Sequence, residues 1–160
     1  MTATLNKFAA RLAELQGSSL DFRFAEGPPP AIIIPARHVA VGEITIYDDG
    51  DELTIDIGRK HHTHVSCYNF DRYPESDRLD MVAQDAAEFV NDVMCDRICI
   101  TIDFIGDRCV GSSHYYIEEE EKDDRGYGVL RGIDIGKSPG GRRSERFLWS
   151  GPIKPAGRTK

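Results

Sequence analysis

The chain lacks any long hydrophobic run. Its 160 residues contain no apolar stretch near the ~20 residues that cross a bilayer, and the apolar cluster at 31–34 is closed by a proline on each side. A secretory signal would need a basic region followed by a hydrophobic core, and the first residues show neither. We therefore expect a cytoplasmic protein of bacterial type that does not enter a membrane.

Cysteine is also scarce. The four residues, Cys67, Cys95, Cys99 and Cys109, do not suggest a disulfide framework, because a domain of this size needs none and nothing marks it for export. Each cysteine stands among apolar neighbours, which favours buried free thiols.

No complete catalytic or phosphate-binding motif is present. The glycines at 126–128 and 136–138 lack the further glycines of a dinucleotide or phosphate loop. Ser112 and His114 lie two apart and would share a strand face, but no glycine-framed serine accompanies them. These absences argue against a serine hydrolase and lead us to expect a non-enzymatic protein without a resident cofactor.

Charge is distributed unevenly along the chain. Residues 1–136 hold 13 basic and 26 acidic side chains, whereas residues 137–160 hold seven basic residues and one glutamate. An acidic body repels nucleic-acid phosphates, so we do not expect a nucleic-acid partner. The basic end, with residues 154–160 expected to be disordered, either folds onto the acidic body or contacts a polyanion. Attraction to the body needs no partner and is favoured.

Two amphipathic helices are predicted. Leucine, phenylalanine and alanine recur at helical spacing over residues 3–16, with Thr4 as the expected N-cap and Gly17 as the stop. A second apolar stripe covers residues 77–94, behind a proline and two capping candidates.

Several strands are predicted around these helices. Alternating isoleucines at 44–46 and 53–57 flank turn-forming aspartates and a glycine, which indicates a β-hairpin. The segment 98–104 is the most apolar strand candidate. Because helices and strands are segregated, we predict one α+β domain over residues 1–153, with an antiparallel sheet of five to seven strands and both helices on one face.

Three of the five histidines stand together at 61–64. If the hairpin register continues through the next turn, His61 faces the core, while His62 and His64 face outward side by side. Such a pair can begin a divalent-metal site, with Asp56, His38 or His114 as further ligand candidates. The alternative is that these are surface histidines that titrate near neutrality.

The leading functional hypothesis is a non-enzymatic interaction domain that resembles an immunity or inhibitor protein in its acidity. Charge complementarity would speed its association with a basic partner protein. The alternative is a small metal-dependent hydrolase or metal-binding protein centred on the histidine cluster. The acidic contact candidates are Asp48, Asp49, Asp51, Glu118, Glu119, Glu120 and Glu121.

Overall fold

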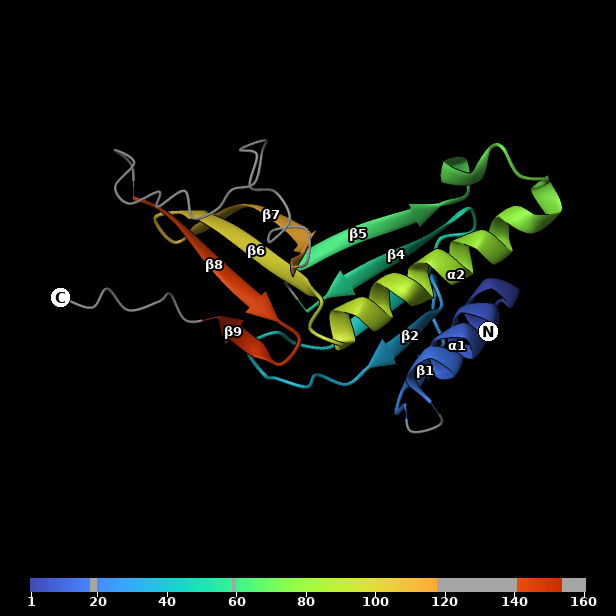
Figure 1. The fold of residues 1–160 in the computed structure, drawn as a ribbon, viewed down its shortest axis with the longest axis horizontal. Coiled ribbons are helices and arrows are strands. Elements are labelled where there is room, and N and C mark those ends of the chain that lie inside the picture. The colour runs from blue at the N-terminus through green and yellow to red at the C-terminus, as the bar shows by residue number, and fades with distance from the viewer. Residues whose placement is uncertain (18–19, 59, 118–140, 154–160) are drawn as a thin grey trace.

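The strands form two antiparallel sheets with two helices beside them (Figure 1). The computed structural model describes residues 1–17, 20–58, 60–117 and 141–153. Within them, five strands pair in the order β1-β2-β3-β4-β5 and four in the order β7-β6-β8-β9. The predicted α+β class is confirmed, with the strands divided between two sheets rather than gathered in one. The elements are α1 (Ala3–Gln16), β1 (Arg23–Ala25), β2 (Ala31–Ile34), β3 (Ile44–Asp48), β4 (Glu52–Ile57), β5 (His61–Ser66), a 3-10 turn η1 (Cys67–Phe70), α2 (Glu75–Met94), β6 (Ile98–Ile105), β7 (Arg108–Tyr116), β8 (Arg142–Leu148) and β9 (Gly151–Ile153).

Helix α1 begins at a threonine cap that also contacts the sheet. The Thr2 hydroxyl accepts a hydrogen bond from the N–H of Leu5 at 3.2 Å and donates one to the buried carboxylate of Asp48 at the end of β3. The cap predicted at Thr4 is wrong, because Thr4 lies buried inside the first turn. The predicted stop is confirmed: Gly17 follows the helix with φ +78°, a conformation that glycine adopts without strain.

Helix α2 begins two residues before the predicted start and ends where predicted. Glu75 and Asp77 lie in its first turn, where negative charge favours the positive end of the helix dipole. Asp96 follows the helix with φ +58°, and aspartate tolerates this left-handed conformation better than most side chains. The chain thereby turns directly into β6.

In strand β4 of the five-stranded sheet, buried side chains alternate with partly exposed ones. The predicted hairpin is confirmed: β3 pairs with β4, with Ile46 opposite Ile55, and β4 continues into β5. The isoleucines of both strands face the helices and are fully buried. Strand β2 is buried along its whole length, and the proline-rich segment before it connects β1 to β2.

The four-stranded sheet is built around β6, the segment predicted as the most apolar strand. It lies between β7 and β8, and Ile98, Ile100 and Ile102 are buried on one face. The acidic residues Glu118–Glu121, a short strand suggested by apolar residues at 129–135, and the basic tail at 154–160 all lie outside the described residues.

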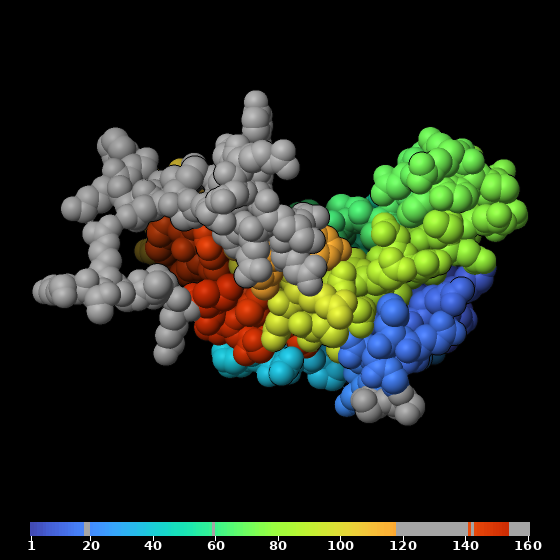
Figure 2. Space-filling model, in the orientation of Figure 1, coloured from blue at the N-terminus to red at the C-terminus, as the bar shows by residue number. Residues whose placement is uncertain are grey.

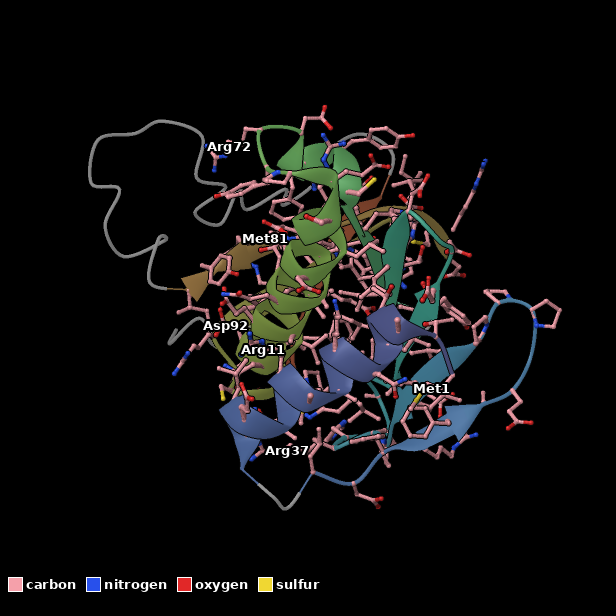
Figure 3. All side chains as sticks on the ribbon, turned by 90° about the vertical axis from the view of Figure 1, so that its right-hand side faces the viewer. Met1, Arg11, Arg37, Arg72, Met81 and Asp92 are labelled. Atoms are coloured by element: carbon pink, nitrogen blue, oxygen red, sulfur yellow. The ribbon has the colours of Figure 1, made fainter. Side chains whose placement is uncertain are left out.

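Both helices and both sheets contribute to one hydrophobic core. Figure 1 draws α1 and α2 in front of the five-stranded sheet, and Figure 3 shows the two helices packed against each other with strands behind them. In the space-filling view the surface of α2 and β6 lies between that of α1 and that of β8 (Figure 2). Neither of the described helices is long and apolar enough to cross a membrane.

Candidate functional site

The two sheets approach each other through their edge strands. β5 is the last strand of one sheet and β7 the first of the other, and the start of β5 lies beside β7 (Figure 1). At this junction the side chains of His61, Ser112 and His114 meet. We call these three residues the junction cluster.

The junction cluster is a chain of two hydrogen bonds centred on His61. Nδ1 of His61 lies 2.9 Å from Oγ of Ser112, and Nε2 of His61 lies 2.8 Å from Nδ1 of His114. His61 is 9% exposed, while Ser112 and His114 are half-buried. The cluster therefore joins β5 to β7 by side chains where no strand pairing between them exists in the described residues.

Aromatic packing fixes the orientation of the second imidazole. The ring of Phe89, from α2, lies edge-on to His114 with centroids 5.0 Å apart. The rings of His61 and His114 are also edge-to-face, at 4.9 Å. Helix, β5 and β7 thus meet at the same two imidazoles, which restrains both side chains.

Burial keeps both imidazoles neutral. Desolvation, together with the neighbouring imidazoles of His114 and His62, lowers the pKa of His61 to about 4. Desolvation also lowers the pKa of His114. Two neutral rings can share one hydrogen bond only if one donates and the other accepts, so at neutral pH one of the two imidazoles donates to the other.

The sequence identified parts of this cluster but not its geometry. The register argument placed His61 toward the core, and the structure confirms it. Ser112 and His114 do share a face, but neither bonds to the other; both bond to His61. The hydrogen-bond partner that both side chains share, His61, comes from a strand about fifty residues earlier in the chain. The only sequence signal for it was the strand alternation that places the His61 side chain toward the core.

His62 and His64 lie on the opposite face of β5, as the register predicted. Their rings are 5.5 Å apart and edge-to-face. His64 Nδ1 lies 3.2 Å from the Glu52 carboxylate and 3.1 Å from the Thr54 hydroxyl, while His62 is opposite Asp56. In the described part of the chain, no group of three or more His, Cys, Asp or Glu side chains is arranged to hold a metal ion. The two histidines therefore form a pair without a third convergent ligand of these types.

The main chain of β5 presents an open edge. The N–H of Cys67 donates to the carbonyl of Asp51 at 2.8 Å, and bonded and non-bonded pairs alternate along an antiparallel ladder. Given the register of β4 and β5, the N–H and C=O groups of His62, His64 and Ser66 point away from β4. No strand of the described residues pairs with this edge.

The edge of β7 is open in the same way. The N–H of Ile117 donates to the carbonyl of Arg97 at 3.0 Å, so the main-chain groups of Ser112 and His114 point away from β6. Within the described residues this row has no strand partner either. Two open edges therefore diverge from the junction cluster.

A groove lies where these edges meet. It has a volume of about 630 Å³ and is lined by Lys60, His61, Cys109 and Ser112 among others. A second groove of about 670 Å³ follows on the far side of the β4–β5 turn and shares Lys60 with the first. Both are open troughs, so they suit a segment of chain better than a fully enclosed small molecule.

The predicted acidic contact residues occupy different environments. Asp48 is buried, and its carboxylate accepts hydrogen bonds from Thr2 and, at 2.9 Å, from the N–H of Gly50. Asp49 and Asp51 are exposed at the β3–β4 turn, where Asp49 accepts a hydrogen bond from Thr54 at 2.8 Å. The structure thus places Asp48 inside the fold and the other two on its surface.

A further carboxylate, which the sequence did not single out, lies on α2. Asp85 stands one turn before Phe89 on the same side of the helix, toward β5 and β7. Burial and the nearby Glu88 raise the pKa of Asp85. Asp85 and Glu88 thus place two neighbouring carboxyl groups on this flank of α2.

All four cysteines are free thiols, as predicted. Cys99 is buried, whereas Cys95 and Cys109 are exposed, so burial was predicted wrongly for those two. Comparison with protein-family models, with curated proteins and with solved structures finds no match for this chain.

Proposed function

We propose that this chain is a cytoplasmic protein-interaction domain that binds an extended, basic segment of a partner protein as an added strand on the open edge of β5. The observation that carries the proposal is the outward row of main-chain groups at His62, His64 and Ser66. Extended peptides bind such edges through main-chain hydrogen bonds, and alternate side chains supply specificity.

The charges beside the edge favour a basic segment. Glu52 and Asp56 lie on the outer face of β4, about 10 Å from an added strand, since that is two strand spacings. Asp85 lies on the other side, on α2. Successive side chains of the added strand would point alternately toward these two acidic surfaces, which suits a segment rich in lysine or arginine.

The acidity of the whole chain supports an inhibitor or immunity type of interaction. The formal net charge is −7 at pH 7, and a surface of one sign attracts a partner of the opposite sign over a distance of about a Debye length. A basic partner bound along the open edge of β5 would have part of its surface covered, and this inhibition would require no chemical step. Asp49 and Asp51, exposed at the neighbouring turn, would add to this attraction.

A proline at the centre of the edge tests the proposal. The N–H of His64 points away from β4, so His64→Pro removes a donor that the existing sheet does not use. His64→Ala is the matched control, because it removes the imidazole and keeps the N–H. Binding is measured by fluorescence anisotropy with decapeptides selected on an array of basic sequences. We expect His64→Ala to bind them and His64→Pro to lose at least tenfold in affinity.

Two outcomes would contradict this assignment in different ways. If no basic decapeptide binds the wild-type chain more tightly than its neutral or acidic counterpart, the basic-partner function is wrong. If basic decapeptides bind and His64→Pro binds them as tightly as His64→Ala, strand addition at β5 is wrong. Circular dichroism of the proline variant establishes that it has folded.

Metal binding at His62 and His64 is the second candidate. The facing imidazoles, 5.5 Å apart, favour it, and the Glu52 carboxylate, 3.2 Å from Nδ1 of His64, would orient that imidazole. Untagged protein is titrated with Zn²⁺ by calorimetry, and the same titration is made with His62→Ala/His64→Ala. An unchanged titration in the double variant would eliminate this candidate.

A further inference from the structure

The junction cluster has the geometry of an activated nucleophile. We propose that Ser112 attacks short carboxylic esters, with His61 as the base that takes its proton and His114 as the residue that positions His61. This activity goes beyond the proposed binding function and does not depend on it, because it uses the side chains of the junction cluster rather than the main-chain groups on the open edge of β5.

Distances and donor directions carry the proposal. A nucleophile within about 2.6–3.2 Å of a base, which is itself oriented by a third group, is the recurring arrangement in covalent catalysis. Here Ser112 Oγ lies 2.9 Å from His61 Nδ1, and His114 Nδ1 lies 2.8 Å from His61 Nε2. When His61 carries its proton on Nε2 and donates it to His114, its Nδ1 is free to accept the proton of Ser112.

The serine is accessible from the groove described above. Ser112 and His61 both line it, and so does Lys60. The N–H of Ser112 points to the open edge of β7. That N–H is the donor nearest to a negatively charged oxygen formed on Ser112. The Lys60 ammonium lies over the Phe147 ring, 5.0 Å from its centroid, and would have to leave that ring to act as a second donor.

The reaction balances with water as the only co-reactant. Ser112 Oγ bonds to the ester carbonyl carbon, and its proton moves to Nδ1 of His61. The bond from carbon to the leaving oxygen then breaks, and the alcohol departs with the proton from His61. Water attacks the acyl-serine, gives a proton to His61, and the carboxylic acid leaves as Ser112 regains that proton.

Burial determines how fast this reaction can be. The lowered pKa of His61, about 4, keeps the ring unprotonated at neutral pH and ready to accept a proton. The same low basicity weakens it as a base, since proton transfer is most efficient when the pKa is near the working pH. Among the residues that the structure describes, no carboxylate takes part in the hydrogen bonds of the cluster. We therefore expect slow turnover and an acyl-serine that accumulates.

Covalent labelling of Ser112 is the direct test. Protein with Cys109→Ser, which removes the exposed thiol from the groove, is treated with a fluorophosphonate probe and examined by intact mass and peptide mapping. Ser113→Ala is the matched control, since the Ser113 side chain lies on the opposite face of β7. We expect one adduct on Ser112 in the parent and in Ser113→Ala, and none in Ser112→Ala. No adduct on the folded parent, or equal labelling of Ser112→Ala, would overturn the proposal.

Ester hydrolysis separates the base from the positioning residue. With p-nitrophenyl acetate, His61→Ala should lose at least 100-fold in kcat/KM. His114→Ala should lower kcat about tenfold at unchanged KM, and His114→Asn, whose amide oxygen replaces Nδ1 as acceptor, should restore most of it. Equal losses in His114→Ala and His114→Asn would show that His114 has no positioning role. The probe on the parent protein remains decisive if an alanine variant does not fold.

Discussion

His61 occupies a position where a positive charge is unfavourable. It is almost fully buried, the imidazoles of His114 and His62 oppose its positive charge, and Lys60 and Asp56 line the same groove. Its two ring nitrogens are both engaged in hydrogen bonds. Protonation would place a hydrogen on both Nδ1 and Nε2 of His61. The hydroxyl oxygen of Ser112 and Nδ1 of His114 would then both have to accept a hydrogen bond from it.

The burial of His61 predicts that the folded chain becomes less stable as the pH is lowered. The pKa of His61 is about 4 in the folded chain against 6.5 for an exposed histidine, so the unfolded chain binds a proton that the folded chain does not between those values. The resulting stability is full above pH 6.5 and is lost as the pH falls toward 4. The lowered pKa of His114 acts in the same direction.

Thermal unfolding measured between pH 7 and pH 5 checks this expectation. The wild-type Tm should fall over this range, and the Tm of His61→Gln should fall less, because glutamine keeps a hydrogen-bonding side chain without the titration. Most carboxylates with ordinary pKa values stay charged in this window, so the difference between the two proteins isolates the imidazole. Parallel curves for the two proteins would mean that His61 does not contribute.

Gly58 holds the turn that carries Lys60 and His61. A Cβ at Gly58 would lie 1.9 Å from the carbonyl oxygen of Val41, and its φ is +55°. The N–H of Gly58 also donates to the Glu43 carbonyl at 2.7 Å. The segment before β3 therefore packs directly against the β4–β5 turn, and only glycine permits this approach.

Substitution of Gly58 should destabilise the fold more than substitution of a comparable turn glycine. Gly58→Ala should lower the free energy of unfolding by about 2 kcal/mol or more, from backbone strain and steric overlap together. Gly50→Ala is the control, since Gly50 has φ +91° with open space around its Cβ position, and it should cost about 1 kcal/mol. Urea denaturation of the three proteins measures both values. Equal losses would show that the contact with Val41 carries no energy.

At the scale of elements, the start of α1 and the end of β3 depend on each other. Thr2 caps the helix through Leu5 and donates to Asp48, which in turn accepts from Gly50 in the hairpin turn. A single hydroxyl therefore links helix, strand and turn. Asp48 is buried at this point, so it has lost the hydration that an exposed carboxylate would keep.

Removal of the Thr2 hydroxyl should destabilise both the start of α1 and the β3–β4 hairpin. Thr2→Ala should lower the free energy of unfolding by about 1 to 2 kcal/mol, whereas Thr2→Ser keeps both hydrogen bonds and should change it little. Hydrogen exchange then locates the effect: faster exchange is expected at Leu5 and at Gly50 in Thr2→Ala. If exchange increases at the helix alone, the link from Thr2 to the hairpin is not significant.

Elements that depend on local pattern were predicted well from the sequence. The spacing of apolar residues gave both helices to within two residues, and alternation around a turn gave the hairpin at 44–57. The cap was misplaced because Thr2 and Thr4 both precede apolar helical positions. Only the contact with Asp48, far along the chain, distinguishes them.

Features that depend on distant contacts were not predicted. The division into two sheets follows from the failure of β5 to pair with β7, and no local pattern encodes that. The junction cluster joins His61 to Ser112 and His114 for the same reason: parity places one imidazole inward, but the identity of what it meets depends on the packing of the sheets.

At the scale of the whole molecule, two sheets with separate hydrogen-bond ladders share one core. Residues of α1, α2 and both sheets belong to the same buried cluster. Trp149, the only tryptophan, follows β8 and lines a groove with Gln16 of α1, Ile34 of β2 and Met94 of α2. The four-stranded sheet is thereby packed against elements of the other half.

Because neither sheet covers its apolar face alone, we expect them to unfold together. Trp149 is 3% exposed, so its fluorescence reports the contact between the halves, whereas far-ultraviolet circular dichroism reports helices and strands throughout. In urea the two signals should give one midpoint and one slope, the behaviour of a single cooperative unit. A fluorescence transition at lower urea than the dichroism transition would mean that the four-stranded sheet separates first. In that case the junction cluster would open before the rest of the fold, and the proposed esterase activity, which needs β5 and β7 together, would be lost before peptide binding at the edge of β5.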